Sequence, residues 1–269
     1  MKTTNKIQLT EEKATLFITL YAKAKDNCSK HSILNDETAE VIIKTVDYNF
    51  LEYNSFGNKL LVIRAKHFDE LVQNFISENK NGIVLYLGCG LDSRILRLNP
   101  SAEIDWFDVD YPEVIQLRKI YYPEKESYKM IESSITETDW FERIPKNRPI
   151  VVIAEGVLEY LTNKEVKTLL TKLTDYFQHG QIIFDVMNSY AVDSAKKDLK
   201  NSTGAVHKWA VDDIGEVDSL NLKLKRISVI SLFKSPYKRN LPFGFRFPMS
   251  IMSHVSRFKN MNRILQYQF

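Results

Sequence analysis

Continuous apolar runs alternate with amphipathic stretches through the middle of the chain. Residues 112–121 and 163–177 have helical spacing, with Pro112 at the start of the first helix and Asn163 as the predicted cap of the second. Uninterrupted apolar runs are typical of strands that are covered on both faces. This alternation predicts an α/β fold with a doubly wound, mostly parallel sheet. The first five strands are expected at Ile83–Leu87, Ile104–Val109, Tyr128–Ile131, Ile150–Ala154 and Gln181–Val186.

The two ends of the chain differ from this central part. Residues 8–79 have mostly helical spacing, with a last helix over residues 68–79 that leads into the first strand. Residues 188–218 are polar and weakly patterned, and Pro236–Pro248 has the prolines and the glycine of a loop. Two further strands are predicted at Leu222–Ile230 and Ile264–Phe269, which brings the expected sheet to seven strands.

The composition is that of an ordinary globular protein, with 44% hydrophobic and 26% charged residues. The chain has no run of 18 apolar residues, so we expect no transmembrane helix. The first ten residues, Met1–Thr10, have no apolar stretch of the kind that secretory signals contain. Cys28 and Cys89 are the only cysteines, too few for a disulfide framework. These features favour a reducing, cytoplasmic location.

The positive charge is concentrated near the C-terminus. Ser219–Phe269 contains ten Lys or Arg residues and no Asp or Glu, whereas the net charge of the whole chain is only +3. Such a segment attracts an anionic substrate, a membrane surface or nucleic acid, or it is the solvated surface of strands and loops. We favour the solvated surface, because no nucleic-acid motif accompanies the charge. We therefore expect neither a nucleic-acid nor a membrane partner, and the sequence indicates no oligomeric state.

A glycine turn follows the first predicted strand, at Gly88-Cys89-Gly90. Glycines at such a turn let the backbone approach a ligand that a Cβ atom would exclude. Asp110 follows 20 residues after Gly90, at the end of the second strand, where an acid can bind ribose hydroxyls. Asp108 is an alternative for this role. The pattern predicts a nucleotide-type site.

Two enzyme classes share this arrangement, the NAD(P) dehydrogenases and the methyltransferases that use S-adenosylmethionine. A dinucleotide site requires a third glycine, and Ser93 stands in its place. Asp92 lies where the next helix begins, and its charge there disfavours a pyrophosphate. S-adenosylmethionine carries a sulfonium and an ammonium, and suits an acidic pocket better. Tyr160 and Lys164 have the Tyr-x-x-x-Lys spacing of short-chain dehydrogenases, but they follow the fourth strand too closely for that fold.

Three motifs, in order and at matching spacing, resemble the leucine carboxyl methyltransferase-like family of class I, Rossmann-like methyltransferases. They begin at Tyr86, Trp106 and Ala154, and read YLGCGLDSR, WFDVDYPEV and AEGVLEYL. The similarity extends upstream to Thr15–Ala24 and to the segment RAKHFD that begins at Arg64. It implies S-adenosylmethionine as the cofactor and O-methylation as the activity.

The resemblance also implies the roles of individual residues. Arg64 is expected to bind the methionyl carboxylate of the cofactor, and Glu155 its ammonium. Gly88, Cys89 and Gly90 would let the backbone approach the methionyl and ribose portion, whose hydroxyls Asp110 would bind. The adenine would lie against Ser134-Ile135, and Tyr160 would line the acceptor side.

One position departs from the family pattern. The family usually has an Asp-Leu pair after the third strand, and this chain has Ser134-Ile135. Serine can hydrogen-bond the adenine amine without a charge, and Glu132 or Glu137 could substitute for the missing acid. The departure leaves open a degenerate family member that acts as a binding protein.

The acceptor is expected to be a small molecule that is methylated on a carboxylate or a hydroxyl. A carboxylate is ionised at neutral pH and needs no general base, which suits a chain without an evident His–Asp pair. The five histidines show no metal-ligand spacing, so no metal site is expected. An NAD(P)-dependent oxidoreductase of the short-chain type is the alternative function. We expect one domain over residues 1–269, with an N-terminal helical cap (1–80), a cofactor-binding core (81–187) and an insert with C-terminal strands (188–269).

Overall fold

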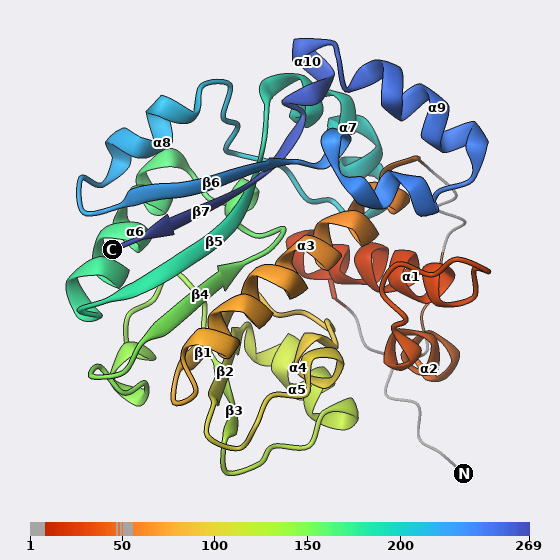
Figure 1. The fold of residues 1–269 in the computed structure, drawn as a ribbon. Helices are drawn as coiled ribbons and strands as arrows, with labels where there is room; N and C mark the ends of the chain where they lie inside the picture. Colours follow the sequence, from red (N-terminus) through yellow and green to blue (C-terminus); the bar gives the residue numbers. More distant parts are fainter. Residues whose placement is uncertain (1–8, 47, 49, 51–55) are drawn as a thin grey trace.

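The computed structural model describes residues 9–46, 48, 50 and 56–269. Most of the segment Met1–Thr10, and residues 47, 49 and 51–55 of the predicted helical cap, lie outside the described residues. A seven-stranded sheet forms the centre of the fold, with helices packed against it (Figure 1).

The sheet has the strand order β3-β2-β1-β4-β5-β7-β6. The first five strands are parallel, and β7 runs antiparallel to both of its neighbours, β5 and β6. This confirms the doubly wound, mostly parallel sheet. The bounds are β1 Ile83–Leu87, β2 Asp105–Asp110, β3 Tyr128–Glu132, β4 Ile150–Ala154, β5 Gly180–Met187, β6 Lys225–Ser231 and β7 Asn262–Gln268.

The register aligns the carboxyl ends of the three central strands. Leu87 at the end of β1 pairs with Val109 on one side and with Ala154 on the other. The residues that follow these positions therefore emerge at one edge of the sheet, where ligands bind in open α/β sheets.

The N-terminal helices lie over one face of the sheet and over the carboxyl ends of its strands. They are α1 (Leu16–Asn27), α2 (Glu37–Thr45) and α3 (Phe56–Glu78), and a 3-10 helix (Glu11–Thr15) precedes them. Their buried side chains form one core cluster with side chains of the sheet, among them Phe17, Phe68 and Tyr86. Helix α3 begins 12 residues before the predicted residue 68. Figure 1 shows α1 beside both α2 and α3.

Helix α6 (Asn163–Tyr176) follows β4, and its N-cap lies one residue before the predicted cap. Thr162, and not Asn163, is the N-cap, because its side chain accepts a hydrogen bond from the Glu165 amide. Glu165 in turn accepts one from the Thr162 amide, 2.7 Å away. This reciprocal pair is a capping box. Asn163 is the first helical residue.

Two segments that were predicted to be unpatterned or loop-like contain helices. Residues 188–218 contain α7 (Ser189–Ser202) and most of α8 (Ile214–Leu220), and α9 (Phe243–Met252) begins within the predicted loop. Helix α7 buries only Ala191, so its sequence lacks a broad apolar stripe. The remaining α-helices are α4 (Arg94–Leu98), α5 (Pro112–Tyr121) and α10 (Ser256–Lys259).

Candidate functional site

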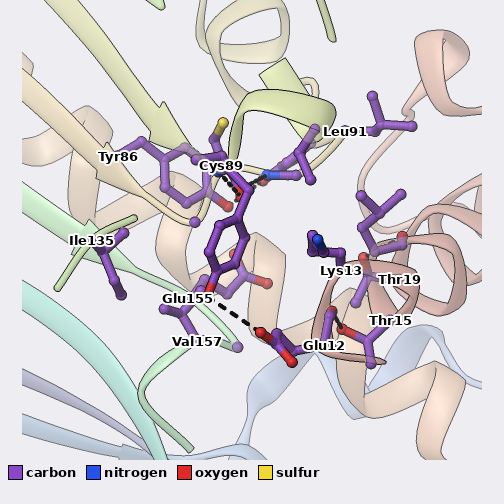
Figure 2. Close-up of a pocket in the computed structure, with 18 of the residues that line it drawn as sticks. Glu12, Lys13, Thr15, Thr19, Tyr86, Cys89, Leu91, Ile135, Glu155 and Val157 are labelled. Carbon is purple, nitrogen blue, oxygen red and sulfur yellow. Dashed lines mark hydrogen bonds between the residues drawn. The ribbon is translucent and has the colours of Figure 1, made fainter. Parts of the chain in front are cut away.

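A pocket lies where β1, β2 and β4 end, beneath α1 and α3. Every site residue predicted from the sequence lines it except Ser134: Arg64, Gly88, Cys89, Gly90, Asp110, Ile135, Glu155 and Tyr160. Figure 2 shows side chains of the sheet and of the N-terminal segment facing one another across this space. The fold thus brings together predicted residues that are up to 96 positions apart in the sequence, from Arg64 to Tyr160.

The glycine turn has the backbone conformation that its sequence predicted. Gly88 and Gly90 have φ values of +64° and +52°, in the left-handed region that favours glycine. A Cβ atom on Gly88 would lie 2.2 Å from Cγ2 of Val157, and one on Gly90 would lie 3.3 Å from the Leu16 Cβ. The Cys89 side chain is buried, and burial raises the pKa of its thiol well above the usual value. This thiol is therefore protonated at neutral pH.

Asp110 is fixed at the end of β2 by two backbone amides. Its Oδ2 accepts from the Gly90 amide and its Oδ1 from the Tyr111 amide, each at 2.8 Å. Burial raises the pKa of this carboxyl to about 6, although both amides favour the charged form. The carboxylate faces the pocket and is poised to accept further hydrogen bonds.

Asp108, the alternative to Asp110, lies outside the lining of the pocket. It is fully buried and forms an ion pair with Arg118, 2.7 Å between Oδ2 and Nη2. Its two oxygens also accept hydrogen bonds from Tyr128 and Trp106. Both oxygens of Asp108 thus have partners within the protein, away from the pocket.

Arg64 and Glu155 form an ion pair in the wall of the pocket. The Arg64 Nε donates to Glu155 at 3.0 Å, and its Nη1 donates to Asp185 at 2.9 Å. The other Glu155 oxygen accepts from Arg94. The two arginines hold the pKa of Glu155 below its ordinary value against the effect of burial. Arg64, expected at the methionyl carboxylate, and Glu155, expected at the ammonium, are therefore already an ion pair.

Asp92 lines the pocket, but its charge is neutralised. Its carboxylate contacts Lys23 of α1 at 2.9 Å and Arg97 of α4 at 2.7 Å, and it accepts a hydrogen bond from Tyr86. Attraction by these cations holds the pKa of Asp92 well below the usual range. The expectation that the Asp92 charge disfavours a phosphate did not take these cations into account. The sequence does not indicate Lys23 as a partner, because it lies 69 residues before Asp92.

The end of the pocket beyond Asp110 is lined by Ser133 and Ile135. Ser134 lies beside them and pairs with Thr136, 2.9 Å between the hydroxyl oxygens. Glu132 forms an exposed ion pair with Lys119. Glu137 lines a separate surface pocket, so neither glutamate lines the site.

The N-terminal segment supplies the opposite wall, with Glu12, Lys13, Thr15 and Thr19 (Figure 2). Glu12 accepts a hydrogen bond from the Tyr111 hydroxyl at 3.2 Å. Sequence reasoning missed these residues and Asp185. The first group lies within or just before the segment Thr15–Ala24 that carries the upstream similarity, and this was the available signal.

Tyr160 lines the pocket from a short 3-10 helix, Leu158–Tyr160. Burial raises the pKa of its hydroxyl, and a hydrogen bond with Thr15 acts in the opposite direction. Lys164, four residues later, is exposed and lines the separate surface pocket. The structure therefore does not assemble the Tyr–Lys pair of a short-chain dehydrogenase.

A buried carboxyl that the sequence did not indicate lies behind Arg64. Glu159 is 7% exposed, and burial together with the nearby Asp185 raises its pKa to about 8. At neutral pH this carboxyl is mostly protonated. It lowers the negative charge around Arg64 from three carboxylates to two.

The sequence model for leucine carboxyl methyltransferases matches residues 17–174. The chain belongs to this family. It is 32% identical to the tetracenomycin polyketide synthesis O-methyltransferase TcmP of Streptomyces glaucescens over 98% of both chains. It is 33% identical to the S-adenosyl-L-methionine-dependent methyltransferase dpfgK of Gibberella zeae, over 80% of both chains. The protein is accordingly an S-adenosylmethionine-dependent methyltransferase.

Solved structures confirm the class I methyltransferase fold. A DUF574 family protein from Streptomyces avermitilis superposes with a TM-score of 0.64 at 7% identity, over 96% of this chain and 97% of that one. A putative S-adenosylmethionine-dependent methyltransferase from Listeria monocytogenes superposes with a TM-score of 0.54 at 16% identity, over 76% of this chain and 97% of that one. Among the described residues, no helix is both long and apolar enough to span a bilayer.

Proposed function

We propose that this methyltransferase transfers the methyl group of S-adenosylmethionine to an oxygen atom of a small molecule, with a carboxylate favoured over a hydroxyl. The observation that carries the proposal is the position of Asp110. Its carboxylate lies in the same pocket as the glycine turn and Arg64, and burial has raised its pKa to about 6. A buried acid that keeps acceptor capacity is suited to a ligand with vicinal hydroxyls.

Different lining residues would contact the different parts of the cofactor. Asp110 would accept the ribose hydroxyls, and the open backbone at Gly88-Cys89-Gly90 would admit the methionyl and ribose portion. Ile135 would pack against the adenine, with Ser134 at its edge. No acid occupies the position after β3, so recognition there would rely on packing and neutral hydrogen bonds.

At the methionyl end, Arg64 would bind the carboxylate through its guanidinium. Two of its nitrogens are directed to Glu155 and Asp185, which fixes the plane of the group. Glu155 would attract the ammonium while remaining paired with Arg94. This prior pairing orients both side chains before the ligand arrives.

The acceptor would enter between the N-terminal segment and Tyr160. When bound, S-adenosylmethionine supplies an electrophilic methyl group with a good leaving group, so the protein has mainly to align the acceptor oxygen and exclude water. The described lining residues include no histidine that could act as a base. Tyr160 holds its proton because burial raises its pKa, so it would donate a hydrogen bond to the acceptor. A carboxylate needs no deprotonation and suits such a site.

The relative TcmP supports oxygen as the acceptor atom, because it is named an O-methyltransferase. We further propose a reducing, cytoplasmic compartment, which agrees with the unpaired state of Cys28 and Cys89. A small molecule, rather than a nucleic acid, is the proposed partner.

Titration calorimetry with S-adenosylmethionine, S-adenosylhomocysteine and NAD(P) tests the cofactor. We expect both adenosyl compounds to bind and the nicotinamide cofactors to produce no heat. Turnover is then measured as S-adenosylhomocysteine release with a panel of small carboxylic acids, alcohols and phenols. Binding without turnover across the panel would favour the degenerate binding protein, and release only with amines or thiols would exclude an O-methyltransferase.

A further inference from the structure

Helix α9 exposes a stripe of large apolar side chains. Phe243, Phe247 and Ile251 follow one another at a spacing of four residues, with exposed fractions of 68%, 55% and 55%. Val255, 46% exposed, follows Ile251 by four residues in the sequence, in extended backbone after the end of the helix. The rings of Phe243 and Phe247 stack with their centroids 5.8 Å apart, which makes the surface continuous. We call these four residues the α9 stripe.

The opposite side of α9 is also apolar. Met249 is fully buried, and Phe245 and Met252 pack against the core cluster that contains α1 and α3. A helix on the surface of a soluble domain normally presents polar residues on its outer side, and one that is apolar all round is covered on all sides. Contiguous exposed apolar surface with a polar rim marks an interaction site. The inner contacts hold α9 in place, so the α9 stripe is available to another surface.

The charged residues that neighbour the α9 stripe in the sequence have one sign. Arg246 lies over the Phe243 ring, 5.7 Å from its centroid, and Lys238 and Arg239 come just before the helix. Arg257 follows the stripe in α10. From Ser219 to Phe269 the sequence contains no Asp or Glu. Aromatic and aliphatic residues flanked by Lys and Arg are typical of helices that lie in the interface of an anionic membrane.

We propose that the α9 stripe docks this enzyme reversibly on an anionic lipid surface. The apolar side chains would enter the boundary between headgroups and acyl chains, and the basic residues would attract the headgroups. A second copy of the chain fits this surface less well, because a symmetric contact would bring two basic surfaces together. An interfacial helix needs no spanning segment, so the proposal agrees with the absence of a helix that could cross a bilayer among the described residues.

This proposal departs from the expectation drawn from the sequence, which interpreted the basic segment as a solvated surface without a membrane partner. That interpretation treated Pro236–Pro248 as a loop, in which the four-residue spacing of Phe243 and Phe247 has no meaning. The structure places both on one helix. The proposal does not depend on the acceptor of the methyl group.

Sedimentation of the full chain with vesicles tests the proposal. The vesicles consist of phosphatidylcholine alone, or of phosphatidylcholine with about one third phosphatidylserine. We expect the protein to sediment with the anionic vesicles and to remain in solution with the neutral ones. Raising the ionic strength to about 0.5 M should weaken the binding, because screening shortens the reach of the basic residues.

A double substitution, Phe243→Ser with Phe247→Ser, should lower the partition coefficient about tenfold or more. Both side chains are exposed, so the fold should persist, which unchanged affinity for S-adenosylmethionine would verify. The matched control is Ile120→Ser, which removes an apolar side chain that is 69% exposed on α5, away from the basic segment. It should bind vesicles as the unaltered protein does.

Three results would overturn the proposal. The first is no sedimentation with anionic vesicles, and the second is equal binding by the double variant and the unaltered protein. The third is a dimer in analytical ultracentrifugation that the double variant abolishes without any vesicle binding, which would assign the α9 stripe to self-association. If the unaltered protein does not bind S-adenosylmethionine, the proposed function is refuted, whereas the proposal for the α9 stripe is not affected.

Discussion

The Asp110 carboxylate accepts a hydrogen bond from the Gly90 amide, with 2.8 Å between Oδ2 and N. This bond joins the end of β2 to the turn after β1, and it orients the acid toward the space that the glycine turn leaves open. The glycine turn and the acid that is expected to bind the ribose are thus linked directly, and the Tyr111 amide holds the other oxygen of the same carboxylate. Any ligand held by Asp110 must pass against the Gly88-Cys89-Gly90 backbone.

Asp110→Ala should weaken S-adenosylmethionine binding by about 100-fold. The substitution removes hydrogen bonds between ribose hydroxyls and a charged acceptor, which contribute roughly 1.5–3 kcal/mol each. Titration calorimetry measures the effect. Asp105→Asn is the control, because Asp105 begins the same strand and pairs with Arg148 at the surface. An unchanged affinity in Asp110→Ala would remove Asp110 from the site.

The affinity for S-adenosylmethionine should fall below pH 6. Burial raises the pKa of Asp110 to about 6, so the carboxylate that accepts the ribose hydroxyls becomes protonated as the pH drops through this value. Between pH 7 and pH 5 the ionised fraction, and with it the affinity, should fall about tenfold. Asp110→Asn should bind weakly with little pH dependence over this range. The same slope in both proteins would assign the titration to another group.

Gly88→Ala should destabilise the protein more than Gly90→Ala. Both substitutions place alanine at a positive φ, which costs about 1–2 kcal/mol. At Gly88 the new Cβ would also lie 2.2 Å from Val157, and such overpacking adds about 1–3 kcal/mol. Urea unfolding gives both values.

Gly244→Ala is the control for these two substitutions. Gly244 lies in α9, and a Cβ atom there would meet nothing within 4 Å. Alanine should therefore raise the free energy of unfolding by up to about 1 kcal/mol. Equal losses for Gly88→Ala and Gly90→Ala would show that the contact with Val157 relaxes easily.

Tyr160→Phe should lower kcat/KM for a carboxylate acceptor by about 10–100-fold and leave the affinity for S-adenosylmethionine within about twofold, as expected for the loss of one hydrogen bond to a charged acceptor. Burial keeps the Tyr160 hydroxyl protonated, so the remaining activity should have the same pH profile as the unaltered enzyme. Steady-state kinetics at several pH values test this. Tyr176→Phe, on α6 and outside the pocket, should be neutral. A loss of the alkaline limb in Tyr160→Phe would instead identify Tyr160 as a base.

The sheet and the glycine turn could be predicted because their signals are local. Continuous apolar runs mark β1 and β4, and Gly88 and Gly90 are needed for the backbone conformation of the turn itself. Asp110 was found because its distance from Gly90 follows from the length of one β-α-β unit. These features depend on neighbours in the sequence.

The electrostatics of the site could not be predicted, because they depend on contacts between distant segments. Lys23 neutralises Asp92 across 69 positions, and Asp185 reaches Arg64 across 121. Helix α9 was missed for a different reason. The prolines and Gly244 were interpreted as a loop, although α9 contains both Gly244 and Pro248, and its apolar residues lie on two opposite sides, which blurs the helical periodicity.

Glu159→Gln should stabilise the protein at alkaline pH and have little effect at pH 5. The pKa of Glu159 is raised from 4.5 to about 8 by burial and by Asp185, so between these values the folded protein retains a proton that the unfolded chain has released. The free energy of unfolding therefore falls as the pH rises through this window. Glutamine keeps the shape of the side chain and cannot ionise, so the variant does not undergo this loss of stability.

At pH 8 we expect the Tm of the Glu159→Gln variant to exceed that of the unaltered protein by about 3 °C or more. Thermal unfolding from pH 5 to pH 8.5, with the exposed Glu103→Gln as control, measures the difference, and parallel curves for the variant and the unaltered protein would show that Glu159 ionises normally.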